Sequence, residues 1–207
     1  MSTYIPREYW LKRGKIYRQQ FQHDRQRKLQ EERLIDYLKT ISPFSSVLEV
    51  GCGFGRITKL VLQSFPHIKE YVAVDLSPDQ IKEAEKYVGN TAGNTHIEFQ
   101  VSEIQALNAD KKYDLVLSCS VLMHILPEEI ERIIKKLGEM ASKHMVNVDW
   151  YEDPIPKQSQ DTWNFVHQYE SLYHTNASVD KVTRIPIVRE GMLGFDTRQS
   201  IFHATTK

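Results

Sequence analysis

The stretch from Val47 to Thr58, which reads VLEVGCGFGRIT, constrains the fold more than any other part of the chain. Its first four residues predict a short buried strand, and apolar residues then recur at helical spacing up to Pro66. Three glycines at alternate positions, Gly51, Gly53 and Gly55, lie between the two elements. Glycine allows a sharp turn and lets a ligand approach the backbone closely. A strand, a glycine turn and a helix in this order predict the opening of a nucleotide-binding α/β unit.

The glycine spacing separates two classes of ligand. A dinucleotide site requires G-x-G-x-x-G, but Arg56 occupies the third glycine position of that pattern. Glu49 lies two residues before the first glycine, where its charge would repel a pyrophosphate. We therefore expect a ligand with a cationic end, and a glycine turn without any ligand remains the alternative.

Composition excludes several classes of protein. The 207 residues contain 27 Lys plus Arg and 27 Asp plus Glu, so no global field favours nucleic acid or an anionic membrane. No apolar run reaches the length of a membrane span, and the start of the chain does not resemble a signal peptide. The two cysteines form neither a metal-ligand pattern nor a disulfide framework. We expect a cytoplasmic α/β domain.

A second strand, Tyr71 to Val74, ends at Asp75, and Ser77 and Pro78 then predict the start of a helix. An acid at the tip of this strand is where a ribose diol needs an acceptor. Further strands are expected at residues 96–101, 113–119 and 145–149, and a terminal hairpin at 182–188 and 198–205. Residues 153–160 predict a flap, and a helix is expected from Thr162.

Residues 1–40 differ from the rest of the chain because basic residues surround an aromatic stripe. Trp10, Tyr17 and Phe21 recur at the spacing of one helical face. We expect an amphipathic helix that flanks residues 41–207 and also serves as a lid, since aromatic rings attract a sulfonium and arginine binds carboxylates.

The motifs at Val47–Thr58 and Tyr71–Ile81 resemble those of the class I S-adenosylmethionine-dependent methyltransferases. The resemblance implies a doubly wound, seven-stranded, mostly parallel sheet of Rossmann-like fold whose last strand inserts antiparallel. It implies S-adenosyl-L-methionine as cofactor and no metal. The implied cofactor contacts are Glu49, Gly51, Cys52, Gly53, Gly55, Asp75, Leu76, Ile81, Glu103, Ile104, Ser118, Cys119 and Tyr17.

The run SVLMHILPEE after the fourth strand resembles the family's loop beside the methyl-transfer point. It makes His124 a candidate general base, although a histidine that only structures the loop is the alternative. Glu103 likewise fits either an adenine contact or an ordinary loop acid. The candidate substrate residues are Asp149, Trp150, Tyr151 and His167.

The expected reaction is methyl transfer to an oxygen or nitrogen of a small molecule, and the basic N-terminal segment permits a carboxylated or phosphorylated acceptor. Three alternatives remain: a nicotinamide oxidoreductase, an RNA or other nucleic-acid methyltransferase, and a non-catalytic regulatory protein that binds S-adenosylmethionine. The sequence favours neither membrane nor nucleic acid as a partner, and it leaves the acceptor and the oligomeric state open.

Overall fold

The computed structural model describes residues 4–21, 26–152, 163–176, 178–187 and 199–207. Seven strands form one sheet in the order β3-β2-β1-β4-β5-β7-β6. The pairs β1–β2, β2–β3 and β4–β5 are parallel, whereas β7 is antiparallel to both β5 and β6. The predicted α/β fold with a mostly parallel seven-stranded sheet is confirmed.

The chain divides into two compact units, Arg7–Leu107 and Met1–Pro6 with Asn108–Lys207. We call them the N-terminal and C-terminal units and describe each separately.

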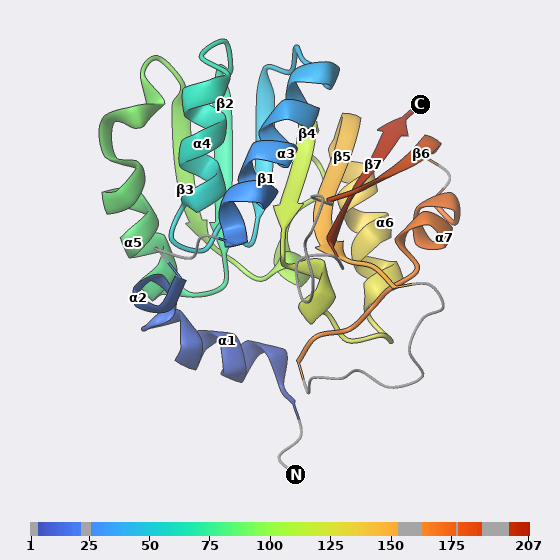
Figure 1. The fold of residues 1–207 in the computed structure, drawn as a ribbon, viewed down its shortest axis with the longest axis horizontal. Coiled ribbons are helices and arrows are strands. Elements are labelled where there is room, and N and C mark those ends of the chain that lie inside the picture. Colours follow the sequence, from blue (N-terminus) through green and yellow to red (C-terminus); the bar gives the residue numbers. More distant parts are fainter. Residues whose placement is uncertain (1–3, 22–25, 153–162, 177, 188–198) are drawn as a thin grey trace. The chain divides into compact units, whose positions relative to one another are not determined.

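The N-terminal unit alternates strands and helices after three initial helices (Figure 1). Its elements are α1 Pro6–Gly14, α2 Tyr17–Phe21, α3 Gln26–Ile41, β1 Ser46–Val50, α4 Arg56–Ser64, β2 Glu70–Asp75, α5 Pro78–Val88, η1 Gly89–Ala92, β3 His96–Val101 and η2 Ile104–Ala106. The parallel register places Glu49 opposite Ala73 and Val50 opposite Val74. The ends of β1 and β2, where a parallel sheet binds ligands, are therefore adjacent.

The initial segment corrects one prediction. We expected a continuous amphipathic helix through Trp10 and Tyr17, but α1 ends at Gly14 and α2 begins at Tyr17. The two rings nevertheless lie 5.9 Å apart, so the expected aromatic contact forms across the turn between the helices.

Helix α3 is attached to the glycine turn through Arg56. From the sequence, this arginine stands out only because it replaces the third glycine of a dinucleotide motif. The Arg56 guanidinium donates to the Glu31 carboxylate and to the Gln30 side-chain oxygen, both at 2.7 Å. Leu34 and Leu38 of α3 are fully buried. The side chain at the third glycine position of a dinucleotide motif therefore has a structural role in this chain.

The C-terminal unit contains the rest of the sheet. Its elements are β4 Tyr113–Cys119, η3 Leu122–His124, α6 Ile130–Met140, β5 Ala141–Trp150, α7 Tyr169–His174, β6 Val179–Pro186 and β7 Gln199–Thr206. Strand β7 lies between β5 and β6, which is the arrangement expected from the family resemblance. Strand β5 begins four residues earlier than predicted because Ala141 already pairs with Tyr113 of β4.

One helix in this unit begins later than predicted. We expected a helix from Thr162, but residues 165–168 form no helix and α7 starts at Tyr169. Phe165 instead donates its backbone N–H to the Met123 carbonyl, and such a contact competes with a helical turn. The predicted flap at 153–160 lies outside the described residues, as do residues 188 and 198 of the predicted hairpin. No helix in the described ranges is long and apolar enough to cross a membrane.

The close packing around Gly55 predicts that a larger residue at this position destabilises the folded protein. Gly55 has φ +84°, and a Cβ there would lie 2.9 Å from the Val88 Cγ2 atom and 3.2 Å from the Ala84 Cβ atom. We expect Gly55→Ala to lower the free energy of unfolding by about 2–5 kcal/mol, because backbone strain and overpacking add. Urea denaturation measures this change.

Gly93→Ala is the matched control, since Gly93 has φ +57° and a Cβ added there would meet no atom within 4 Å. Its φ of 57° and ψ of −118° lie outside the left-handed helical region, so the variant should cost about 1–3 kcal/mol of backbone strain and nothing for overpacking. Equal losses in the two variants would contradict the packing argument.

Candidate functional site

The glycine turn between β1 and α4 is held by the end of β2. The N–H groups of Gly51 and Cys52 donate to the Val74 carbonyl at 2.7 and 3.0 Å, and the N–H of Gly53 donates to Asp75 Oδ2 at 2.9 Å. Gly51, Gly53 and Gly55 all have positive φ, at 70°, 56° and 84°. A side chain at any of the three positions would strain the backbone, so the geometry explains the alternate glycines.

Asp75 is oriented by the backbone on both sides. Besides the bond from Gly53, the N–H of Ser77 donates to Asp75 Oδ1 at 2.9 Å. Burial raises the pKa of this carboxyl, and the two N–H donors oppose that rise. Each carboxylate oxygen has a lone pair beyond the one used here, so Asp75 can still accept bonds from two neighbouring hydroxyl groups.

Glu49 is a buried carboxylate at the end of β1, with 2% of its surface exposed. Its Oε2 atom accepts hydrogen bonds from the Thr58 and Tyr71 hydroxyls at 2.6 and 2.7 Å. Burial raises the pKa of Glu49 from 4.5 to about 7, although these two bonds lower it in part. Because burial destabilises the charged form, a cation beside Glu49 would be strongly favoured.

Other predicted cofactor residues of the N-terminal unit are apolar or small. Leu76 and Ile104 are half-buried, and Ile81 is buried on α5. Cys52 is buried, and burial raises the pKa of its thiol, which disfavours the reactive thiolate. Its expected role as a small buried residue of the turn agrees with this environment.

Two residues of this unit connect the site to the initial helices. The Tyr17 ring lies 6.4 Å from the ring of Phe54, a residue of the glycine turn. The Glu103 carboxylate accepts a 2.7 Å bond from Arg7 Nε of α1, and both side chains are largely exposed. The adenine contact proposed for Glu103 remains a prediction, and the structure gives this acid a second partner that the sequence did not suggest.

In the C-terminal unit, the loop after β4 begins with a strained residue. Ser118 is buried and Cys119 is half-buried at the end of the strand. Ser120 follows with φ 58°, a left-handed conformation that is uncommon outside glycine, and its N–H donates to the Val148 carbonyl at 2.7 Å. Such strain persists only where the surroundings enforce it, and it concentrates at functional sites.

Asp149 enforces the path of this loop. It is fully buried, and its Oδ1 atom accepts the N–H groups of Val121 and Met123 at 3.1 and 3.2 Å. Its Oδ2 atom accepts the Asn147 amide at 2.7 Å, and Tyr173 donates its hydroxyl to that amide's oxygen. Burial raises the pKa of Asp149 to about 7. The structure therefore shows Asp149 anchoring the loop, and the substrate contact predicted for it stays a prediction.

His124, the candidate base, is half-buried on this loop. Its Nδ1 atom lies 2.9 Å from the Trp163 carbonyl, and its own carbonyl accepts a 3.2 Å bond from the Tyr4 hydroxyl. A carbonyl can only accept, so Nδ1 carries the proton and the lone pair of the neutral ring is on Nε2. The two roles expected for His124 are therefore compatible, because the contact that structures the loop also orients the ring.

The remaining substrate candidates lie in different surroundings. His167 is buried with Nε2 3.1 Å from the Ile125 carbonyl, and burial lowers its pKa to about 4, so the ring is neutral. Trp150 is buried, whereas Tyr151 is half-buried beneath the Arg184 guanidinium, 4.0 Å from the ring centre. His167 was expected on a helix, but it precedes α7 and supports the loop that carries His124.

Sequence reasoning missed the residues that support the site from neighbouring strands. Tyr71 and Asn147 were read as ordinary strand positions, and Tyr4 was not considered. A tyrosine or asparagine inside an otherwise apolar strand was the available signal, because a buried polar group requires a partner. Within the described ranges, no group of three or more His, Cys, Asp or Glu side chains is placed to hold a metal ion.

Comparison with known proteins agrees with this geometry. The model of a family described as a methyltransferase domain matches residues 47–144, a range that includes the glycine turn, Asp75 and the His124 loop. Residues 47–144, a little under half of the chain, are therefore similar to a methyltransferase domain, as the resemblance of the two motifs predicts. Members of this family use S-adenosylmethionine as methyl donor.

Two curated relatives match parts of the chain. A malonyl-[acyl-carrier protein] O-methyltransferase of Ilyobacter polytropus is 34% identical over 128 residues, which cover 56% of this chain and 46% of the relative. A trans-aconitate 2-methyltransferase of Streptomyces avermitilis is 29% identical over 87 residues, which cover 42% of this chain and 32% of the relative. These matches span less than half the length of either enzyme.

Solved structures share the fold over nearly the whole chain. The N-methyltransferase NodS of Bradyrhizobium japonicum, solved with S-adenosylhomocysteine, superposes with a TM-score of 0.75 at 17% identity and covers 98% of this chain and 99% of its own. A magnesium protoporphyrin IX methyltransferase of Synechocystis, solved with the same ligand, gives 0.74 at 17% identity and covers 97% of this chain and 98% of its own. This methyltransferase fold therefore includes the helices that precede β1.

The raised pKa of Glu49 predicts a pH dependence of stability. As pH rises, the unfolded chain releases its Glu49 proton near pH 4.5, whereas the native chain keeps it until about pH 7. The contribution of Glu49 to the free energy of unfolding is therefore complete below about pH 4.5 and is lost as pH rises to about 7. Urea denaturation across this range should show a shallower decline for Glu49→Gln, which keeps an acceptor oxygen for Thr58 and Tyr71. Parallel curves would show that Glu49 ionises normally in the folded protein.

The anchoring role of Asp149 is tested by Asp149→Asn. The asparagine side chain has one acceptor oxygen and one NH2 donor. In the variant, either the loop N–H groups or the Asn147 NH2 group would therefore face another donor. We expect a loss of about 1–3 kcal/mol in the free energy of unfolding and faster hydrogen exchange at Val121 and Met123. The exposed Asp180→Asn is the control and should stay within about 0.5 kcal/mol of the unmodified protein. Unchanged exchange at the two loop amides would exclude this role.

Proposed function

We propose that this protein transfers the methyl group of S-adenosylmethionine to an oxygen or nitrogen of a small-molecule acceptor. The observation that carries the proposal is the pair of oriented carboxylates, Glu49 and Asp75, at the ends of adjacent strands on either side of the glycine turn. The two carboxylates fit S-adenosylmethionine. One end of this ligand carries an amino group, which Glu49 can bind, and its centre carries a ribose diol, which Asp75 can bind.

The N-terminal unit supplies most of the proposed cofactor contacts. Glu49 takes the amino group, and both of its hydrogen bonds end on Oε2, so Oε1 is the proposed contact atom. Asp75 takes the ribose hydroxyls. The other proposed contacts are the backbone of the glycine turn, the side chains around the adenine and an aromatic residue of the lid, namely Gly51, Cys52, Gly53, Gly55, Leu76, Ile81, Glu103, Ile104 and Tyr17.

The chemistry requires alignment more than activation. S-adenosylmethionine supplies a methyl group already activated by its sulfonium, and aligning an acceptor with it can contribute up to ~7–11 kcal/mol. Ser118 and Cys119 at the end of β4 remain proposed cofactor contacts. His124 is the proposed base, and its Nε2 lone pair suits the removal of a proton from the acceptor near neutral pH.

The acceptor is proposed to be a metabolite rather than a nucleic acid. Three arginines of the basic N-terminal segment are engaged within their own unit: Arg7 with Glu103, Arg18 with Glu83, and Arg27 with the Tyr17 ring. They are therefore not arranged as a free phosphate-binding stripe. Relatives named for trans-aconitate and malonyl-[acyl-carrier protein] support the same choice. Trp150, Tyr151 and His167 remain candidate acceptor contacts, together with the loop that Asp149 anchors.

Titration calorimetry with S-adenosylhomocysteine tests the cofactor assignment. We expect saturable binding by the unmodified protein and none of NAD or NADP. Asp75→Ala removes a charged hydrogen-bond acceptor, so the binding free energy should fall by about 1.5–3 kcal/mol, which is roughly a 10- to 150-fold loss of affinity.

The control is Asp79→Ala, which removes an exposed carboxylate from the first turn of α5. This variant should bind as the unmodified protein does. Absence of S-adenosylhomocysteine binding by the unmodified protein would overturn the proposed function, and equal affinity of the two alanine variants would overturn the ribose assignment.

A further inference from the structure

The end of α1 lies against the start of α5 at a distance that only glycine permits. Gly14 is buried, and a Cβ at this position would lie 2.3 Å from Ser77 Oγ and 2.9 Å from Ser77 Cβ. Ser77 is the N-cap of α5, where its side chain accepts from the Gln80 N–H. Any larger residue at position 14 would therefore push the first helix away from the residues that follow Asp75.

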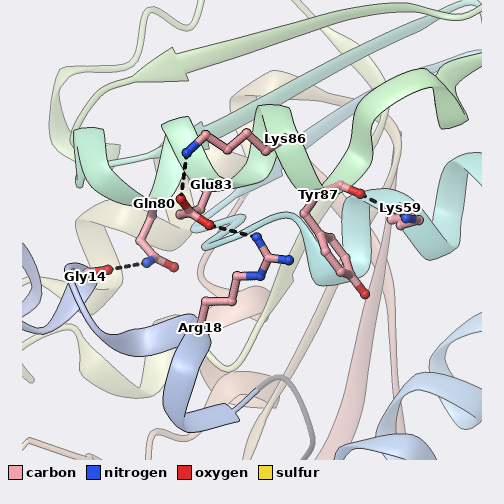
Figure 2. Close-up of polar contacts among 7 residues, drawn as sticks. All are labelled: Gly14, Arg18, Lys59, Gln80, Glu83, Lys86 and Tyr87. Carbon is pink, nitrogen blue, oxygen red and sulfur yellow. Dashed lines mark hydrogen bonds and ion pairs between the residues drawn. The ribbon is translucent and has the colours of Figure 1, made fainter.

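Gln80 bonds the two helices together at this point. Its side-chain Nε2 donates to the Gly14 carbonyl, and only 4% of the residue is exposed (Figure 2). Because a carbonyl cannot donate, the nitrogen of the amide must face Gly14 and the oxygen must face the other way. A Cβ on Gly53 would lie 3.5 Å from this Oε1 atom. A single amide thus lies between the first helix and the glycine turn.

The Oε1 atom of Gln80 is buried and has no hydrogen-bond partner among the described residues. A buried acceptor without a partner destabilises the folded state, and this cost offsets what the hydrogen bond from Gln80 to the Gly14 carbonyl contributes. Folding stability alone therefore does not account for an amide here. What the Gln80 amide does that an apolar side chain could not is donate a hydrogen bond to the Gly14 carbonyl.

A second attachment lies one turn along α5. Arg18 of α2 donates to the Glu83 carboxylate at 2.7 Å, Lys86 binds the same carboxylate at 3.1 Å, and the Arg18 guanidinium lies 5.0 Å from the Tyr87 ring centre (Figure 2). These side chains are partly exposed, so salt screens their attraction. The bond from Gln80 is the buried and specific attachment of the two.

Tyr17 lies between the two attachment points. Its ring contacts Phe54 of the glycine turn and Trp10 of α1. Attaching Gly14 and Arg18 to α5 thus places this ring over the turn that we assign to the cofactor. Release of Gly14 would free the chain on the N-terminal side of Tyr17 and loosen this contact.

We infer that Gln80 is a positioning residue that holds the N-terminal helices closed over the glycine turn and thereby prolongs the binding of the cofactor. This inference rests on the proposed function. It assigns to Gln80 an effect on the dissociation rate of the ligand, exerted through the Gly14 carbonyl rather than by contact with the reacting atoms.

The rate at which labelled S-adenosylhomocysteine dissociates into an excess of unlabelled ligand tests the inference. Gln80→Met keeps the length of the side chain and removes the bond to Gly14 together with the unpaired oxygen, so its urea midpoint should stay close to that of the unmodified protein. Loss of one hydrogen bond should raise the dissociation rate about three- to tenfold with little change in the association rate. Gln20→Met, at an exposed position of α2, is the matched control and should leave both rates unchanged.

Gly14→Ala provides a second variant that leaves Gln80 itself in place, because its Cβ would lie 2.3 Å from Ser77 Oγ and push α1 and α5 apart. It should raise the dissociation rate as Gln80→Met does. Hydrogen exchange of residues 6–21, measured with saturating ligand, should be faster in both variants than in the unmodified protein. Unchanged dissociation and exchange in the two variants would overturn the role of Gln80. Failure of the unmodified protein to bind S-adenosylhomocysteine would instead overturn the proposed function.

Discussion

The bonds between the glycine turn and the end of β2 are the constraint on which the site depends. The Val74 carbonyl accepts two N–H groups of the turn, and the Asp75 carboxylate accepts a third. These bonds require the left-handed backbone that glycine supplies at alternate positions. They also orient Asp75, so the folding of the turn and the placement of the proposed ribose acceptor are a single event.

Buried carboxylates recur in both units with different tasks. Glu49 is held by two hydroxyl groups on one oxygen and is proposed to face a cation, whereas Asp149 uses both oxygens to bind a loop and an amide. Burial raises the pKa of each to about 7. The difference lies in the partners: the donors around Asp149 occupy both oxygens, and those around Glu49 occupy one. This difference separates a ligand-binding acid from a structural one more clearly than burial does.

The sequence predicted the fold closely wherever short-range signals were strong. The glycine turn, the Ser77 cap and Asp75 at the end of β2 were read correctly because each follows from local backbone requirements. The helix expected from Thr162 was wrong because Phe165 and His167 bond to the loop around Met123, a long-range contact with no local signature. The supporting roles of Tyr71 and Asn147 were missed because a polar residue in an apolar strand signals only that it needs a partner, and the partners, Glu49 and Tyr173, lie far away in the chain. The bonds from Gln80 to Gly14 and from Arg56 to Glu31 likewise join residues far apart in the chain.

A crystal structure of the protein with S-adenosylhomocysteine tests the central claim most directly. Our account predicts that the ribose hydroxyls lie about 3 Å from the two Asp75 carboxylate oxygens, and that the ligand's amino group lies at a similar distance from Glu49 Oε1. A ligand bound elsewhere, or bound at the glycine turn without contact to either carboxylate, would contradict the account.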